Sequence, residues 1–319
     1  MTTNTVTQQA SSEELAAAPT SIAETRTFFE EWLTVPFKAY SAKHLPSETA
    51  YTVQDETISV EDGQFGVRYI VPVVENEHET FPVLVYMHGG GWSAGDLELD
   101  DYHLRKVSVD LKISIVNVDY RLAPEHPFPT AVNDGLATLK WVVSNTPLLK
   151  ADLSKGFIVC GHSAGGNLAS VLAHEARDDP FFSGPGRQLT GQLLREPMVI
   201  HPDVYPEELK EEPPLPPIVH TVLAFYNPDP LDPRFSSLLY PSHSGVPRAY
   251  VQSMELDSGG VYVKALRQAG VEAKYKKYLG ADHGFHYGTP ETELAVKVRA
   301  DMVEGLKWLL GRESNIDGV

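Results

Sequence analysis

Short apolar segments alternate with amphipathic segments along most of the chain. Apolar, β-branched-rich runs predict strands at 51–60, 64–74, 82–87, 113–118, 156–160, 189–197, 250–254 and 273–278. Apolar residues at helical spacing predict helices at 101–111, 131–144, 166–177, 260–269 and 292–310. Strands that alternate with helices of this size indicate βαβ units and a parallel sheet. The strands are apolar enough to be buried on both faces.

The N-terminal region changes character near residue 20. Residues 1–20 are polar, without an aromatic residue, and are typical of a mobile tail. From Ser21 onward, apolar residues recur at helical spacing, which predicts an amphipathic helix capped at Thr20 or Ser21. Its aromatic residues suit core packing or the wall of a pocket, with core packing favoured; they are Phe28, Phe29 and Trp32.

Residues 180–218 interrupt the strand–helix alternation. Gly184-Pro185-Gly186 and the run of prolines from Pro213 to Pro217 disfavour regular structure. We expect an inserted, irregular cap here that contains one strand-like run at 189–197. The predicted organisation is a tail at 1–20, a cap segment at 21–50, a catalytic domain at 51–179 and 219–319, and the cap insertion at 180–218.

Composition narrows the classes of protein to which the chain can belong. Of its 319 residues, 42% are hydrophobic and 22% are charged, as in an ordinary globular protein. The net charge of −17 disfavours nucleic acid and anionic membranes as partners. One cysteine, Cys160, excludes an internal disulfide and a thiolate-rich metal site. With no apolar run of membrane-spanning length and no basic-then-apolar start, we expect a cytoplasmic protein.

The strongest local signal is Gly-His-Ser-Ala-Gly at residues 161–165. It follows a predicted strand and precedes a predicted helix, as a nucleophile elbow requires. The sharp turn exposes the Ser163 hydroxyl above the sheet, and the N–H groups of the new helix face developing negative charge. Ser163 is therefore the candidate nucleophile.

A second signal is His-Gly-Gly-Gly-Trp at residues 88–92, directly after a predicted strand. Glycines let backbone N–H groups approach a carbonyl oxygen without a Cβ in the way. Gly90 and Gly91 are the candidate oxyanion donors, and Ala164 after the nucleophile is a third.

A catalytic triad then needs an acid and a histidine C-terminal to Ser163, in that order. His283 follows the predicted strand 273–278, where a loop can return to the elbow, and is the candidate base; His286 is a distant second. The strand at 250–254 runs into a loop with two carboxylates, Glu255 and Asp257. Position alone leaves both open as the acid that orients the imidazole.

Four motifs in order resemble the hormone-sensitive lipase-like branch of the α/β-hydrolases: His-Gly-Gly-Gly at 88–91, Asp-Tyr-Arg-Leu-Ala-Pro-Glu-His-Pro-Phe-Pro at 119–129, Gly-His-Ser-Ala-Gly-Gly at 161–166, and Asp-His-Gly-Phe at 282–285. The resemblance covers residues 81–310. It implies an α/β-hydrolase fold, with a mostly parallel central sheet flanked by helices and a cap from the N-terminal helices and an insertion. It also implies hydrolysis of carboxylic esters without metal or cofactor.

The acid loop departs from the pattern of this family. Members usually carry Asp-Pro-Leu-Arg-Asp-Glu after the corresponding strand, whereas this chain has the shorter Leu-Asp-Ser-Gly-Gly at residues 256–260. Alignment from either side places an aspartate at Asp257, so the resemblance favours Asp257 over Glu255. The shortened loop is expected to weaken the triad or to reshape the pocket.

The resemblance indicates a small-molecule ester as substrate, with a short to medium acyl group or a lactone, and is compatible with natural-product tailoring. Trp92, Phe29 and Trp32 are candidate pocket residues. Two rival classes are a non-hydrolytic enzyme on the same scaffold (an acyltransferase, dehydratase or isomerase) and a ligand-binding receptor. The receptor is disfavoured because both Ser163 and His283 are present. A homodimer stays open.

Overall fold

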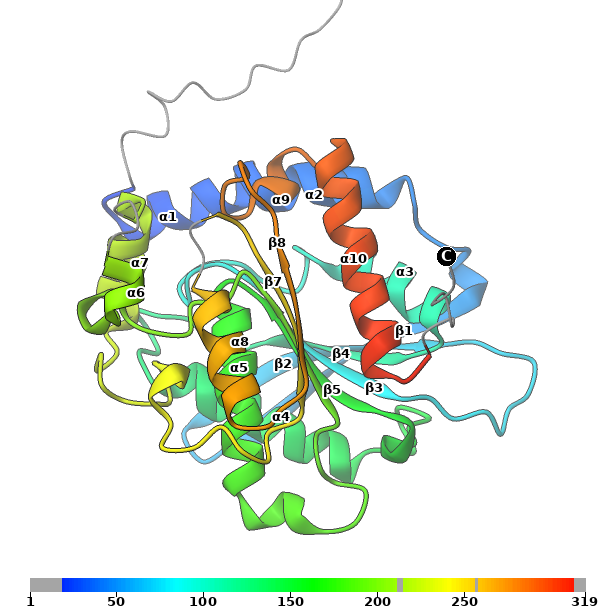
Figure 1. Ribbon diagram of the computed structural model, residues 1–319. Helices are drawn as coiled ribbons and strands as arrows, with labels where there is room; N and C mark the ends of the chain where they lie inside the picture. Colours follow the sequence, from blue (N-terminus) through cyan, green and yellow to red (C-terminus); the bar gives the residue numbers. More distant parts are fainter. Residues whose placement is uncertain (1–18, 211–214, 256–257, 313–319) are drawn as a thin grey trace, which may run out of the picture.

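The computed structural model describes residues 19–210, 215–255 and 258–312. Within these residues, eight strands form one sheet in the order β1-β2-β4-β3-β5-β6-β7-β8 (Figure 1). Their bounds are β1 (Tyr51–Val60), β2 (Gly63–Pro72), β3 (Val83–Met87), β4 (Ser114–Asp119), β5 (Phe157–His162), β6 (Gly191–Arg195), β7 (Arg248–Ser253) and β8 (Ala273–Lys277).

The strands are antiparallel at the β1–β2 edge of the sheet and parallel in the rest of it. β2 runs antiparallel to both β1 and β4, and all pairs from β4 to β8 are parallel. Parallel strands place their carboxyl ends at one edge, where ligands bind in open α/β sheets. The predicted α/β fold with a mostly parallel sheet is confirmed.

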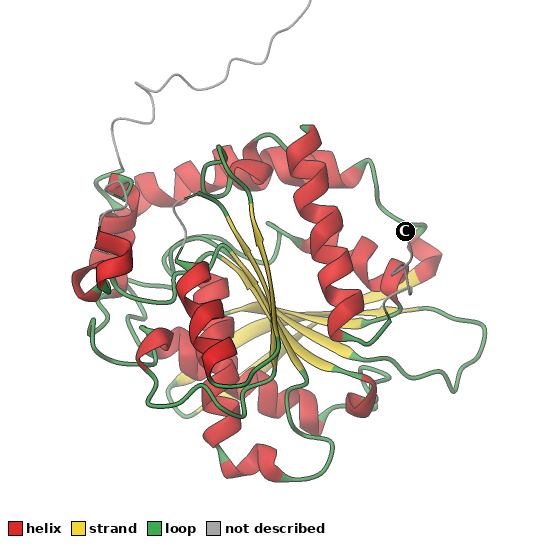
Figure 2. Ribbon diagram, in the orientation of Figure 1, coloured by secondary structure: helices red, strands yellow, loops and turns green. Residues whose placement is uncertain are grey.

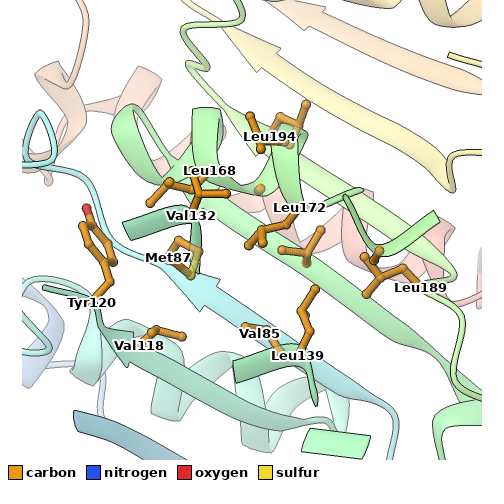
Figure 3. Close-up of a cluster of buried hydrophobic side chains, with 14 of the residues drawn as sticks. Val85, Met87, Val118, Tyr120, Val132, Leu139, Leu168, Leu172, Leu189 and Leu194 are labelled. Atoms are coloured by element: carbon orange, nitrogen blue, oxygen red, sulfur yellow. The ribbon is translucent and has the colours of Figure 1, made fainter. Parts of the chain in front are cut away.

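Helices cover both faces of the sheet (Figure 2). On one face the apolar core joins the sheet to α4, α5 and α8, and on the other face to α3 and α10. Figure 3 shows side chains of β3 and β6 meeting those of α4 and α5 in the larger core. The bounds of these helices are α3 (Asp101–Leu111), α4 (Thr130–Ser144), α5 (Ala164–Asp178), α8 (Gly259–Gln268) and α10 (Glu293–Leu309).

The N-terminal helix is longer than its apolar spacing predicted. α1 (Ile22–Phe29) continues through a π-helical turn, η2 (Glu30–Thr34), into α2 (Val35–Ala42). Ser21 is its N-cap and forms a capping box with Glu24. Ser21 is one of the two residues predicted as the cap. In Figure 1 this helix lies along one side of the molecule beside α9 (Phe285–Gly288).

Part of the segment expected as a cap insertion belongs to the sheet. β6 lies inside 180–218, yet it pairs with β5 and β7 in the interior of the sheet. All five of its residues are buried, and Leu193 and Leu194 pack in the hydrophobic cores on the two faces of the sheet. The boundary at 180 was therefore too early. α6 (Glu207–Lys210) and α7 (Pro217–Tyr226) follow β6, and α7 extends past residue 218.

No helix in the described part of the chain is long and apolar enough to cross a membrane.

Candidate active site

The nucleophile elbow has the geometry predicted from its sequence. β5 ends at His162 and α5 begins at Ala164, and Ser163 between them has φ 54° and ψ −115°. A Cβ at Gly161 would collide with the Gly165 backbone, and one at Gly165 would collide with the Met87 carbonyl. Only glycines permit this close crossing of strand and helix. The Ser163 N–H donates to the Arg195 carbonyl at 2.8 Å, which ties the elbow to the end of β6.

The structure brings His283 to the nucleophile. Its Nε2 lies 2.8 Å from the Ser163 Oγ, although the two residues are far apart in sequence. His283 lies in the loop after β8, and its side chain is 43% exposed. The distance is within hydrogen-bond reach of a general base. His286, the second candidate, is fully buried.

The glycine loop lies beside the same strand ends. Gly90 and Gly91 have φ values of 129° and 60°, and the Gly90 carbonyl accepts bonds from Ser93 and Ala94. Ala164 is the first residue of α5, where N–H groups have no intrahelical acceptor. Among the described residues, none accepts a hydrogen bond from the N–H groups of Gly90, Gly91 or Ala164. These groups remain the candidate oxyanion donors.

Two contacts of Tyr120 brace the glycine loop. The ring of Tyr120 stacks on that of His88 at 4.2 Å, and its hydroxyl donates to the His88 carbonyl at 2.9 Å. Arg121 pairs with Asp134 of α4 at 2.7 Å and with Asp62 at 3.0 Å. The segment that begins at Asp119 therefore supports the loops around the site.

The candidate pocket residues lie in different surroundings. Trp92 is 2% exposed and stacks in parallel with Tyr226 of α7 at 4.9 Å, so it joins α7 to the core. Phe29 is half-buried, and Trp32 is 42% exposed in η2, which packs against α9, the short helix after His283.

Of the two candidate acids, the structure describes Glu255 only. Asp257 lies outside the described residues. Glu255 is exposed, and its carboxylate accepts a hydrogen bond from the Gly280 N–H at 2.8 Å. Glu255 therefore supports the start of the histidine loop.

A buried glutamate that was not predicted lies beneath the site. Glu196 follows β6 and is 1% exposed, with a positive φ of 52°. One carboxylate oxygen accepts from the Gly284 N–H at 2.6 Å and lies 3.6 Å from the His283 Nδ1. The other accepts from the His286 Nε2 at 2.7 Å and lies 3.4 Å from the His162 Nε2.

The charges in this cluster follow from burial and mutual contact. Burial lowers the pKa of His286 to about 3 against the opposing effect of Glu196, so this imidazole is neutral near pH 7. It then donates through Nε2 to Glu196, and the Arg195 guanidinium lies 3.4 Å from its Nδ1. Burial alone would raise the pKa of Glu196, but the neighbouring imidazoles His162 and His286 hold it well below its usual range. Glu196 is a carboxylate at neutral pH.

The same cluster is the one group among the described residues that could supply three metal ligands. The ligand atoms of His162, Glu196 and His286 lie within 4.8 Å of one another. However, the Arg195 Nη2 is 3.2 Å from the His286 Nε2. A permanent positive charge at this distance opposes a bound cation. The arrangement suits a hydrogen-bonded network better than a metal centre.

One sequence signal could have revealed Glu196. Arg195 and Glu196 directly follow Leu193 and Leu194 at the end of a predicted strand, and the carboxyl ends of parallel strands meet at the edge that holds Ser163 and His283. A charged pair at that position is unusual for a buried strand.

Comparison with known proteins agrees with the fold. A family model described as alpha/beta hydrolase fold matches residues 84–287. The chain is 34% identical to an AB hydrolase superfamily protein of Schizosaccharomyces pombe over 86% of this chain and 84% of that one. It is 37% identical to the carboxylesterase NlhH of Mycobacterium tuberculosis, over 68% of this chain and 69% of that one.

Solved structures show the same likeness. Vibralactone cyclase superposes with a TM-score of 0.86 at 37% identity, covering 93% of this chain and 92% of that one. An esterase of Pyrobaculum calidifontis superposes with a TM-score of 0.75 at 30% identity, covering 91% of this chain and 93% of that one. The chain therefore belongs to the α/β-hydrolase-fold family, as a carboxylesterase-type hydrolase of its hormone-sensitive lipase-like branch.

Proposed function

We propose that the chain hydrolyses carboxylic esters through an acyl-enzyme on Ser163, with His283 as general base and Asp257 as the acid that orients it. The observation that carries this proposal is the 2.8 Å contact between the Ser163 Oγ and the His283 Nε2 at a strained strand-to-helix turn. A nucleophile within hydrogen-bond reach of a base is the arrangement that activates a serine.

In the proposed mechanism, His283 takes the Ser163 proton as the oxygen attacks the ester carbonyl. The N–H groups of Gly90, Gly91 and Ala164 stabilise the oxyanion, with the N-terminal end of α5 adding to the favourable field. The protonated His283 then donates its proton to the leaving alcohol, which departs and leaves an ester on Ser163. Water activated by His283 hydrolyses that ester and restores the enzyme.

We propose short to medium acyl esters or lactones as substrates. A Cβ at Gly91 would collide with the side chain of Val222, so α7 lies directly against the glycine loop and limits the room there. Phe29 and Trp32 would border the apolar side of the substrate. A relative named versiconal hemiacetal acetate esterase, from Dothistroma septosporum, is 30% identical over 81% of this chain and 82% of that one, and supports a natural-product acetate as a candidate substrate.

The test is hydrolysis of p-nitrophenyl esters over a series of acyl lengths, with Ser163→Ala beside the unmodified protein. We expect kcat/KM to be highest for short acyl chains and to fall by a factor of about 10⁴ or more in Ser163→Ala. Mass spectrometry after a phosphonate ester should find the adduct on Ser163. Undiminished turnover in Ser163→Ala would overturn the mechanism.

The likeness to vibralactone cyclase supports a second candidate, acyl transfer to a hydroxyl of the same substrate. The acyl-enzyme is common to both reactions, and only the acceptor differs. An ester of a hydroxy acid would separate them, because hydrolysis releases the hydroxy acid and cyclisation releases the lactone. A product that contains only hydroxy acid from a range of such esters would exclude the cyclase.

A further inference from the structure

We propose that Glu196 is a positioning residue, a second carboxylate that fixes the His283 loop and favours the His283 imidazolium formed during turnover. The inference rests on the proposed function, since it assigns Glu196 to the base of that reaction. Its role is compatible with Asp257 as the acid, because Glu196 approaches from beneath the loop at the end of β6, on the side of Gly284 and His286.

The first step is the anchoring of the loop. Glu196 accepts from the Gly284 N–H at 2.6 Å and from the His286 Nε2 at 2.7 Å. These two donors lie on the C-terminal side of His283, within three residues of it, and Gly284 has φ 72°. One carboxylate therefore holds the loop on which the placement of the His283 ring over Ser163 depends. Misplacement of a base by a small distance costs much of its catalytic effect.

The negative charge of Glu196 also acts on the His283 ring. The Glu196 carboxylate oxygen that binds Gly284 lies 3.6 Å from the His283 Nδ1. An opposite charge at such a distance favours the protonated imidazole. Glu196 is 1% exposed, so its carboxylate is shielded from water, while the His283 ring is 43% exposed and the interaction is partly screened from that side.

The third step concerns the other charged and titratable groups that face Glu196. His162 of β5 and His286 of α9 are buried, and burial lowers the pKa of each imidazole, so both are neutral near pH 7. Tyr287 of α9 is also neutral, since burial raises the pKa of its phenol. Arg195 of β6 is the one permanent cation among the described residues that face Glu196, and it contacts His286. His283 is thus the group whose protonation changes beside Glu196 in the reaction.

The backbone of Glu196 has an unusual conformation. Glu196 has φ 52°, a conformation that glycine adopts more easily. Its N–H donates to the Gln252 carbonyl of β7 at 2.7 Å. Strained non-glycine residues concentrate at functional sites, where the side chain is needed. At this position a glycine would relieve the backbone but would leave the Gly284 N–H and the His286 ring without their acceptor.

The test compares Glu196→Gln with Glu196→Asp and the unmodified protein. The amide removes the charge, so we expect the acidic limb of the kcat/KM pH profile to move to lower pH by about one unit. We expect kcat to fall about tenfold and KM to change less than twofold, because the substrate does not contact Glu196. Glu196→Asp keeps the charge but moves it farther from the His283 ring. The acidic limb of its pH profile should therefore move to lower pH by a smaller amount.

A direct readout is the NMR titration of the His283 ring, which requires no substrate. Its midpoint should move to lower pH in Glu196→Gln, also in the Ser163→Ala background. Glu175→Gln is the matched control, because Glu175 is a half-buried glutamate that accepts from the Tyr240 hydroxyl at 2.6 Å away from this loop. It should leave the profile and the titration unchanged.

The outcomes separate this inference from the proposed function. An unmoved His283 titration and an unmoved acidic limb in both Glu196 variants would overturn the positioning role, even if stability fell. If Glu196→Gln does not fold, the Glu196→Asp profile decides alone. Full ester hydrolysis by Ser163→Ala would instead overturn the proposed function, whatever the titration shows.

Discussion

At the residue scale, the glycine loop offers a test of oxyanion stabilisation. Gly90 has φ 129°, and a Cβ there would collide with the Ala94 backbone, so Gly90→Ala must displace the loop. We expect kcat for p-nitrophenyl acetate to fall by a factor of about 10² to 10³, the usual cost of losing one donor. Gly186→Ala is the control, because Gly186 also has a positive φ, of 72°, with open space around it. It should lower stability by about 1 kcal/mol and leave kcat intact; equal losses of kcat in both would contradict the prediction.

The triad acid is the second test at this scale. We expect Asp257→Asn to lower kcat by a factor of about 10⁴, since the amide favours the wrong imidazole tautomer. Glu255→Gln should change kcat only a few-fold, because Glu255 is exposed and bonded to the Gly280 N–H. Steady-state kinetics on the same ester decides between them. Normal turnover in Asp257→Asn, with its loss in Glu255→Gln, would make Glu255 the acid.

Site residues that lie in a local sequence pattern could be predicted, whereas those placed by contacts between distant parts of the chain could not. Ser163 and the glycine loop could be predicted because their backbone turns demand glycines in a local pattern. His283 could be predicted because it follows a strand whose end meets the elbow. Glu196 could not be assigned in the same way, because its role depends on contacts with Gly284 and His286, far away in sequence.

At the element scale, a buried ring of the N-terminal helix packs against the segment that follows His283. Phe37 of α2 is 1% exposed and packs edge-on against Tyr287 at 4.9 Å. We expect Phe37→Ala to lower the free energy of unfolding by about 3 kcal/mol or more. Trp32→Ala, at an exposed position, should cost less than about 1 kcal/mol. Urea unfolding measures both, and a small cost for Phe37→Ala would mean that the helix is held elsewhere.

α3 and β1 begin and end at the residues predicted from the sequence. In α3 the buried residues Leu104, Val107 and Leu111 recur at helical spacing, so the period is set by its one buried face. The continuation of α1 into α2 was missed, since Pro36 follows a π-helical turn and its position in the first turn of α2 is tolerated. β6 was recognised as a strand but assigned to the cap segment, because the glycines and prolines around it resemble an insertion. The pairing with β5 and β7 depends on distant parts of the chain and is not visible in that segment.

At the scale of the whole molecule, buried histidines link stability to pH. Burial lowers the pKa of His174 to about 4 and that of His286 to about 3, whereas an unfolded chain protonates histidine near pH 6.5. Between these values the unfolded state binds more protons, so the free energy of unfolding rises with pH. The contribution of each group is complete above about pH 6.5 and is lost as the pH falls toward the folded pKa. Each adds a slope of at most about 1.4 kcal/mol per pH unit.

His174 is the better residue for testing this linkage, because it lies away from Ser163. Its Nδ1 lies 2.9 Å from the Ser170 carbonyl oxygen, and its ring stacks on Tyr240 at 4.1 Å. We expect His174→Gln to reduce the slope of unfolding free energy between pH 6 and pH 5 by about 1 kcal/mol per pH unit. His78→Gln, at an exposed loop position, should keep the slope of the unmodified protein. Urea denaturation at each pH provides the slopes, and equal slopes for all three proteins would show that His174 takes up its proton alike in the folded and unfolded states.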